Sequence, residues 1–192
     1  MSTKIYTPKF RVSFPNVFEA RAVGEEGKKK FSLNMLFNMA EIKKDPEQLK
    51  LWNGLLQAVK DAARLEWGDK VPPSLKSPFR DGKEKPDYDG YGEGIIFVNA
   101  SSLSRPGVVD RNMQRIIDPN EFYAGCYARA TVNTYAWKYM GKAGISIGLQ
   151  NLQKLEDGEP FGGKSNPEND FDAVESTPAA AADDTNATAL FG

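Results

Sequence analysis

The chain has 192 residues, 40% of them hydrophobic and 11% aromatic, which is enough for one folded domain with an extension. It contains no histidine, so Ser–His–Asp and Cys–His catalysis and the most frequent transition-metal ligand are excluded. Cys126 is the only cysteine, so an internal disulfide and a thiolate zinc site are excluded too. We expect Cys126 to be a small buried residue, and we expect no cofactor.

The net charge of −1 is the sum of two oppositely charged parts. Residues 1–155 carry 24 basic and 17 acidic side chains, a net charge of +7. Residues 156–192 carry nine acids and one lysine, a net charge of −8. A cationic body of this kind indicates a polyanionic partner, and its charge fits RNA as well as DNA.

The first ten residues, MSTKIYTPKF, lack the apolar core of a secretory signal. No stretch of the chain approaches the about 20 apolar residues that a membrane span needs. We therefore expect a protein of the cytoplasm, without a membrane partner.

The first two predicted strands show hydrophobic residues at every second position. Residues 9–14 alternate in this way, and Pro15 and Asn16 are expected to end that strand. Residues 28–38 alternate again, with basic and polar side chains on one face. The opposite face of that second strand carries Phe31, Leu33, Met35 and Phe37.

One amphipathic helix follows the two strands. Asp45 is a typical N-cap, Pro46 fits the first helical position, and hydrophobic residues recur at helical spacing until Gly68. Residues 71–94 are rich in Pro, Gly and charge and are expected to form a long loop. One further strand is predicted at residues 95–100, and residues 107–117 could hold another strand or an arginine-rich ribbon.

The last predicted strands form a hairpin. Residues 123–139 and 143–155 are strand-like, and Gly141 and Lys142 connect them tightly. The pattern predicts a mainly β fold of five strands and one amphipathic helix, which we expect to form a barrel. We assign residues 1–160 to this domain and residues 161–192 to a disordered acidic tail.

The strand 123–139 has two different faces. Small residues occupy most even positions, whereas Tyr127, Arg129, Tyr135, Trp137 and Tyr139 occupy odd ones. If the small residues pack inside, the large rings form a surface on which bases can stack. In the alternative arrangement, the rings fill the barrel and the alanines face outward, or a bulge switches faces midway.

Basic residues in several segments could follow a phosphate backbone. A lysine run at 28–30 could act with basic residues on the neighbouring strand, and arginines gather around residues 105–115. Either set could also be an ordinary solvated surface. The predicted DNA-binding residues are Lys9, Arg11, Lys28, Lys30, Arg105, Arg111, Tyr127, Arg129, Tyr135, Trp137, Lys138, Tyr139 and Lys142.

An enzymatic alternative, a magnesium-dependent nuclease or recombination enzyme, rests on three acidic residues. Asp87, Asp89 and Glu93 could bind magnesium, as clustered carboxylates do in two-metal nucleases. Because glycines and a proline surround them, a turn is the simpler interpretation. A third alternative is an interaction protein without affinity for DNA.

Four segments in succession resemble a known phage family: FRVSFPN at 10–16, YAGCY at 123–127, GKAGIS at 141–146 and QKLEDGE at 153–159. The family comprises single-stranded DNA-binding proteins of tailed bacteriophages, and the resemblance covers roughly residues 8–163. It implies an OB-fold-like five-stranded antiparallel barrel that coats single strands without strong sequence preference during phage replication, recombination or repair.

The acidic tail also resembles the tails of replication single-strand binders, which end in a hydrophobic tip. Such tails recruit replication or recombination proteins and compete with DNA for the basic surface. By this resemblance, the partner-binding residues would be Asp183, Asp184, Leu190 and Phe191.

Overall fold

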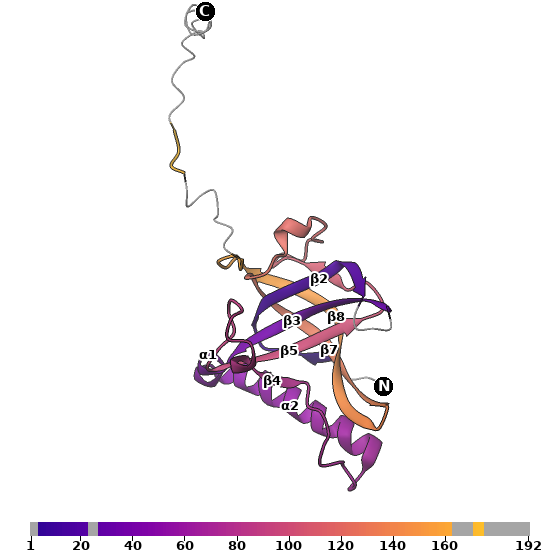
Figure 1. Ribbon diagram of the computed structural model, residues 1–192. Helices are drawn as coiled ribbons and strands as arrows, with labels where there is room; N and C mark the ends of the chain where they lie inside the picture. Colours follow the sequence, from indigo (N-terminus) through magenta and orange to yellow (C-terminus); the bar gives the residue numbers. More distant parts are fainter. Residues whose placement is uncertain (1–3, 23–26, 163–170, 175–192) are drawn as a thin grey trace, which may run out of the picture.

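The computed structural model describes residues 4–22, 27–162 and 171–174, and shows a β-barrel with a long helix across one end (Figure 1). No helix within these residues is long and apolar enough to cross a membrane. The elements are β1 Ile5–Tyr6, β2 Phe10–Ala22, β3 Lys29–Asn38, α1 Met39–Lys44, α2 Pro46–Trp67, β4 Phe79–Asp81, the 3₁₀ turn Gly82–Glu84, β5 Ile95–Ser102, β6 Gly107–Val109, the 3₁₀ turn Pro119–Glu121, β7 Tyr127–Tyr139 and β8 Lys142–Glu156.

Five strands close into a ring. They follow the order β7-β2-β3-β5-β8, and β7 also pairs with β8, so no strand of the ring is left with an open edge. This arrangement confirms the predicted five-stranded barrel. The expectation that every pair is antiparallel is wrong at one place, because β5 and β8 run parallel through Ala100↔Ile147 and Ser101↔Gly148. A closed ring with an odd number of strands cannot alternate direction throughout.

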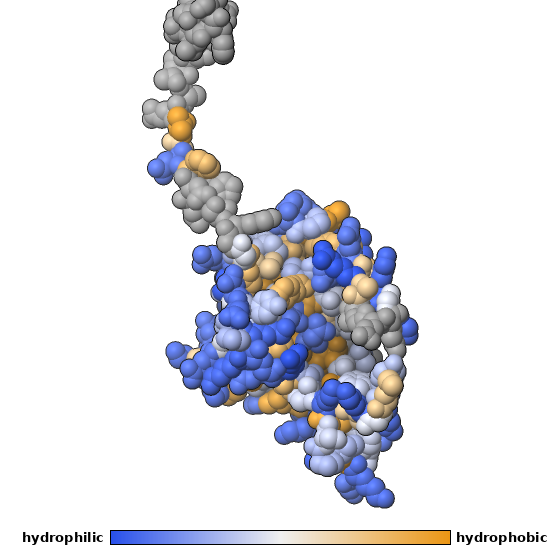
Figure 2. Space-filling model, in the orientation of Figure 1, coloured by the Kyte–Doolittle hydropathy of each residue, from blue (hydrophilic) through white to orange (hydrophobic). Residues whose placement is uncertain are grey.

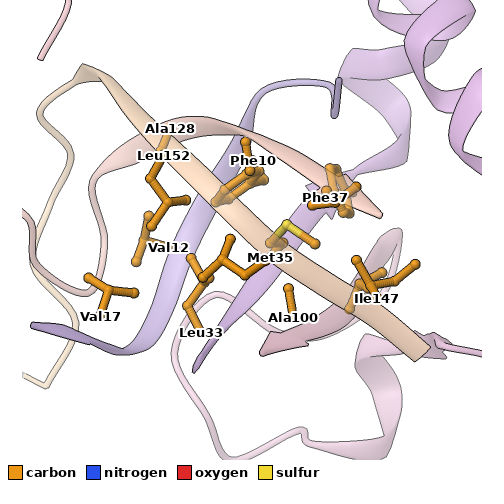
Figure 3. Close-up of a cluster of buried hydrophobic side chains, with 14 of the residues drawn as sticks. Phe10, Val12, Val17, Leu33, Met35, Phe37, Ala100, Ala128, Ile147 and Leu152 are labelled. Atoms are coloured by element: carbon orange, nitrogen blue, oxygen red, sulfur yellow. The ribbon is translucent and has the colours of Figure 1, made fainter. Parts of the chain in front are cut away.

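The barrel interior is filled by alternate residues of the five strands (Figure 3). The predicted inner face of β3 is confirmed for Leu33, Met35 and Phe37, which are fully buried. On β7 the small residues Ala128 and Ala130 point into the core. The alternative in which the β7 rings fill the barrel is therefore wrong.

Helix α2 closes one end of the barrel. Asp45 caps it by accepting hydrogen bonds from the backbone N–H groups of Glu47 and Gln48, as the sequence predicted. Its Trp52 is buried between Phe37 and Phe79, with ring centroids 5.1 and 5.3 Å away. This aromatic stack attaches the helix to β3 and to β4.

Strand β2 does not end at Pro15, as the sequence analysis expected, but continues to Ala22. The pairing with β3 shifts between Ser13 and Asn16, so that Phe14 and Pro15 together oppose a single residue of β3. Such a bulge tolerates proline, which has no N–H to donate to the ladder. It also turns Phe14 out of the alternation, and 48% of this residue is exposed.

Several short elements were not predicted. The expected loop 71–94 contains β4 and a 3₁₀ turn, and α1 and β1 lie outside every predicted element, whereas β6 falls within the strand-like segment expected at 107–117. Each is too short to show a hydrophobic period, and its pairing partner lies far away in the sequence. β7 begins at Tyr127 rather than Tyr123, because Gly125 takes a φ of 111° and its position leaves no room for a side chain against Glu159.

Candidate nucleic-acid interface

A row of polar side chains crosses the outer face of β2, β3 and β5, the side of the barrel seen in Figures 1 and 2. Ser13, Asn34 and Asn99 occupy paired positions on the three strands. Asn99 donates to Asn34 at 3.0 Å, Asn34 donates to the Tyr91 hydroxyl at 2.9 Å, and Tyr91 donates to Ser13 at 3.0 Å. These hydrogen bonds fix the row in one arrangement. Figure 2 shows hydrophobic residues lying between hydrophilic ones on this face.

The same outer face continues onto β8 and β7. Ser101 of β5 pairs with Gly148 of β8, and Gly148 pairs with Asn133 of β7. Paired residues point to the same side of a sheet, so the polar row passes without a break from β2 to the β7–β8 hairpin. Gly148 has no room for a side chain because the Asn133 amide lies directly over it.

The hairpin carries three of the predicted stacking residues on this outer side. Tyr135 is 39% exposed, Tyr139 lies near the tip, and Trp137 covers Gly144. A Cβ atom at Gly144 would lie 2.6 Å from the Trp137 ring, so the indole rests flat on the backbone of β8. The hairpin therefore presents rings at one end of the polar row, as the alternation in β7 predicted.

Lys138 and Lys142, also predicted to bind DNA, occupy different positions on the hairpin. Lys138 points toward α2, where its ammonium lies 2.9 Å from the Glu66 carboxylate and 5.7 Å from the centre of the Trp67 ring. Lys142 is exposed and pairs with Tyr139 on the outer side. Of the two, Lys142 is placed beside the rings.

At the β2 end of the polar row lies a cluster of rings that the sequence analysis missed, here called the aromatic ridge: Phe14, Tyr88 and Tyr91. The Phe14 and Tyr88 centroids are 5.5 Å apart and nearly perpendicular, and Tyr88 and Tyr91 are 5.9 Å apart. Tyr91 in turn packs edge-on against Phe97 of β5. Tyrosines within a Gly-rich segment were the available signal, but their docking on β2 depends on contacts remote in sequence.

Two of the predicted basic residues, Lys28 and Lys30, lie where β2 ends and β3 begins. Lys30 pairs with Arg21 across the strands. The Arg105 guanidinium lies 5.7 Å from the centre of the Phe18 ring, on the same half of β2. These cations flank the outer face and can reach a strand that follows the polar row.

The expectation that Lys9 and Arg11 join the lysine run is wrong. Arg11 pairs with Leu36, at the opposite end of the β2–β3 hairpin from Lys30. The Lys9 ammonium lies 3.1 Å from Glu156 and 5.2 Å from the centre of the Tyr127 ring. Their contact with DNA stays a prediction, as does that of Tyr127.

Arg111 and Arg129 lie beside β6 rather than on the polar row. Arg129 donates from Nε to Gln153 of β8 at 2.7 Å. Gln153 donates to the carbonyl of Asp110 at 3.3 Å, in the turn that bears Arg111. The predicted arginine cluster is thus divided between Arg105 on the outer face and this second group.

The magnesium alternative gains no support from the geometry. Among the described residues, no three carboxylate, histidine or cysteine side chains stand close enough to hold a metal ion. Asp89 accepts a hydrogen bond from the backbone of Gly162 at 3.0 Å, and Glu93 lies 3.8 Å from Lys83. The acidic segment thus serves turns and local pairs.

A partly buried polar cluster holds the end of β8 to the barrel. The Tyr123 hydroxyl donates to Asp157 at 2.9 Å and accepts from the Gly158 N–H at 3.2 Å. Burial raises the pKa of Tyr123 to about 12 and that of Cys126, which is fully buried as predicted, to about 11. Hydrogen bonds from Lys154 and Tyr123 lower the pKa of Asp157.

The predicted tail residues Asp183, Asp184, Leu190 and Phe191 lie outside the described residues. Phe161 and Gly162, assigned to the tail from the sequence, still contact the barrel. The Phe161 N–H donates to the carbonyl of Ala124 at 3.0 Å, and its ring lies against Gly90.

A closed ring of five strands in this order, with one parallel pair and a polar and aromatic outer face, defines an OB-fold barrel of the kind that binds nucleic acids. The family model described as Enterobacter phage Enc34, ssDNA-binding protein, matches residues 3–185. The chain belongs to this family.

Relatives and solved structures agree with this assignment. The chain is 31% identical over 170 residues to protein p50 of Acyrthosiphon pisum secondary endosymbiont phage 1, covering 83% of this chain and 87% of that protein. Its fold is similar to that of the single-stranded DNA-binding protein of bacteriophage Enc34 in complex with ssDNA (TM-score 0.69, 21% identity, 83% and 89% of the two chains). It is also similar to gp2.5, a single-stranded DNA-binding protein of bacteriophage T7 (TM-score 0.57, 12% identity, 85% and 97% of the chains).

Proposed function

We propose that this protein binds single-stranded DNA on the outer face of β2, β3 and β5 and on the adjoining β7–β8 hairpin. The observation that carries the proposal is the unbroken polar row from Ser13 to Asn133, with exposed rings on the hairpin and cations along its side. The relative from phage Enc34, whose solved structure contains ssDNA, supports it.

Such a face favours single strands over duplex. A base can lie flat on Tyr135 or Trp137 only when it is released from its neighbours, whereas a duplex keeps its bases stacked inside. Each stacked base contributes about 1–3 kcal/mol, and every base has a ring face to offer. Affinity without strong sequence preference follows, and this suits a protein that coats exposed strands in phage replication, recombination or repair.

The acidic tail has a regulatory part in this proposal. Residues 161–192 carry six acids and one lysine, a net charge of −5, whereas residues 1–155 carry +7, so the tail can compete with DNA for the cationic face. When DNA has displaced the tail, replication or recombination proteins bind the hydrophobic residues Leu190 and Phe191.

Fluorescence anisotropy with labelled oligonucleotides tests both parts. The full chain and a version ending at Gly163 are titrated against a dT oligonucleotide, a matched duplex and an RNA of the same length, at low and moderate salt. We expect tight binding to single-stranded DNA, weaker binding to duplex, and tighter binding after removal of the tail. Absence of binding by both versions would refute the proposal. Equal affinity with and without the tail would refute only the tail's role.

A further inference from the structure

The backbone of Phe14 has an unusual conformation that serves the outer face. Its φ is 47°, in the left-handed region that non-glycine residues rarely adopt. The bulge at Phe14 and Pro15 produces this conformation and directs the ring away from the core. Bulges and positive φ values of this kind gather at binding sites, where they re-aim a side chain. An apolar ring held out of the core by a strained backbone requires an explanation other than packing.

Tyr88 stands against Phe14 and is equally open. Its exposed fraction is 49%, and the ring meets Phe14 edge-to-face at 5.5 Å. The base of the ridge is rigid, because Tyr91 is hydrogen-bonded to Ser13 and Asn34 and packs against Phe97. The two outer rings therefore present a fixed apolar surface to solvent, beside the first residue of the polar row.

The charges around the ridge fit a nucleic-acid strand. The Lys85 ammonium lies 5.1 Å from the centre of the Tyr88 ring and 5.8 Å from that of Phe97. Two of the three nearby carboxylates have partners of their own: Glu84 is bound by Arg80 at 2.7 Å, and Asp89 by the Gly162 N–H, while Asp87 precedes Tyr88 in the chain. A cation thus stands next to the rings, as a base with its attached phosphate requires.

We propose that Phe14 and Tyr88 form a stacking site for an unpaired nucleobase, at the end of the polar row opposite the hairpin, with Lys85 beside the adjoining phosphate. This inference rests on the proposed function and specifies the site further. The strand enters over β2, crosses β3 and β5 along the asparagines, and leaves over the rings of the β7–β8 hairpin. Two stacking sites separated by neutral amides hold the strand without reading its sequence.

The test compares Phe14→Ala and Tyr88→Ala with Tyr88→Phe and with Tyr6→Ala. Tyr6 is a matched control, because it is 54% exposed but lies on β1, which is not part of the polar row. Loss of one stacked base corresponds to an increase in Kd of about fivefold to a hundredfold. We expect this increase for a dT oligonucleotide with Phe14→Ala and with Tyr88→Ala, and an unchanged Kd with Tyr88→Phe and Tyr6→Ala.

An abasic oligonucleotide of the same length identifies the cause. Because stacking needs a base, the wild type and both alanine variants should bind the abasic strand equally, with the same dependence on salt. Unchanged thermal unfolding shows that each variant is folded. If wild type binds the dT oligonucleotide and both alanine variants bind it as tightly, the stacking site is refuted while the proposed function stands. If wild type does not bind, the proposed function itself has failed.

Discussion

Arg11 of β2 is tied to Glu159, which follows the last strand of the barrel. Its Nη2 donates to the Glu159 carbonyl at 2.7 Å, and its Nε donates to the Gly125 carbonyl at 3.0 Å. The guanidinium also lies 4.3 Å from the centre of the Phe161 ring. A residue that the sequence suggests as a phosphate contact therefore holds the segment after β8 against the barrel.

Arg11→Lys should accordingly destabilise the fold without changing the electrostatics of DNA binding. A lysine cannot reproduce the two hydrogen bonds that the Arg11 guanidinium donates from Nε and Nη2. We therefore expect the free energy of unfolding to fall by about 1–3 kcal/mol. Urea denaturation measures this loss. Arg11→Ala, which also removes the positive charge, tests for a phosphate contact. The slope of log K against log[salt] for a dT oligonucleotide should be the same for this variant as for wild type. A slope reduced by about 0.7 would instead place Arg11 on a phosphate.

The cations beside the connected end of the β2–β3 hairpin should behave in the opposite way. Replacing Lys28, Lys30 and Arg105 together with alanine removes three contacts to phosphate, and each is worth about 0.7 in the salt slope for a single strand. We expect the slope to fall by about 2 and stability to change little. Lys50→Ala, on the exposed side of α2, is the control and should leave the slope unchanged. An unaltered slope in the triple variant would show that the strand does not pass this end of the barrel.

Gly144→Val should disturb the hairpin surface through Trp137. The added side chain would occupy the space of the indole, 2.6 Å from its ring, and would displace the ring from β8. We expect weaker binding of a dT oligonucleotide, by about fivefold or more if one stacked base is lost, together with a changed tryptophan emission.

A second glycine provides the matched control for this variant. Gly54 lies within α2, and a Cβ there would have no atom within 4 Å. Gly54→Ala should therefore stabilise the protein by up to about 1 kcal/mol and leave DNA affinity unchanged. If a folded Gly144→Val variant binds DNA with wild-type affinity, Trp137 does not contribute to DNA binding.

The local patterns of the sequence were sufficient to predict the barrel strands and the helix. Alternation identified the inner face of β3, and Asp45 with Pro46 marked the start of α2. The alternation in β7 also separates the rings from the small residues, although it leaves open which of the two faces points outward. Each of these features depends on residues within one element, where hydrophobic period and capping act directly.

The features that escaped prediction depend on contacts between remote segments. Strand β2 continues past Pro15 because a bulge against β3 absorbs the proline, and the same bulge exposes Phe14. Tyr88 and Tyr91 reach the outer face only because their loop folds back over β2. The acceptor of Arg11, the Glu159 carbonyl, is 148 residues away, so no local pattern identifies this hydrogen bond.

The Tyr123 cluster makes stability depend on alkaline pH. The pKa of Tyr123 is about 12 in the folded protein, raised from 10.0 mainly by burial. Above pH 10 the unfolded chain therefore loses the phenol proton while the folded chain keeps it. The unfolded state then binds fewer protons than the folded state, so the free energy of unfolding falls with pH. The contribution of Tyr123 to stability is therefore complete below pH 10 and is lost as the pH rises toward 12.

Tyr123→Phe isolates this contribution. At pH 8 the variant should be less stable than wild type by about 1–2 kcal/mol, because the hydrogen bonds to Asp157 and Gly158 are lost. Between pH 10 and 12 its stability should decline less steeply, so that the difference from wild type shrinks. Urea denaturation at a series of pH values measures both curves, and Tyr6→Phe, remote from this cluster, should follow wild type. Parallel curves for Tyr123→Phe and wild type up to pH 12 would show that the hydroxyl does not remain protonated in the folded barrel.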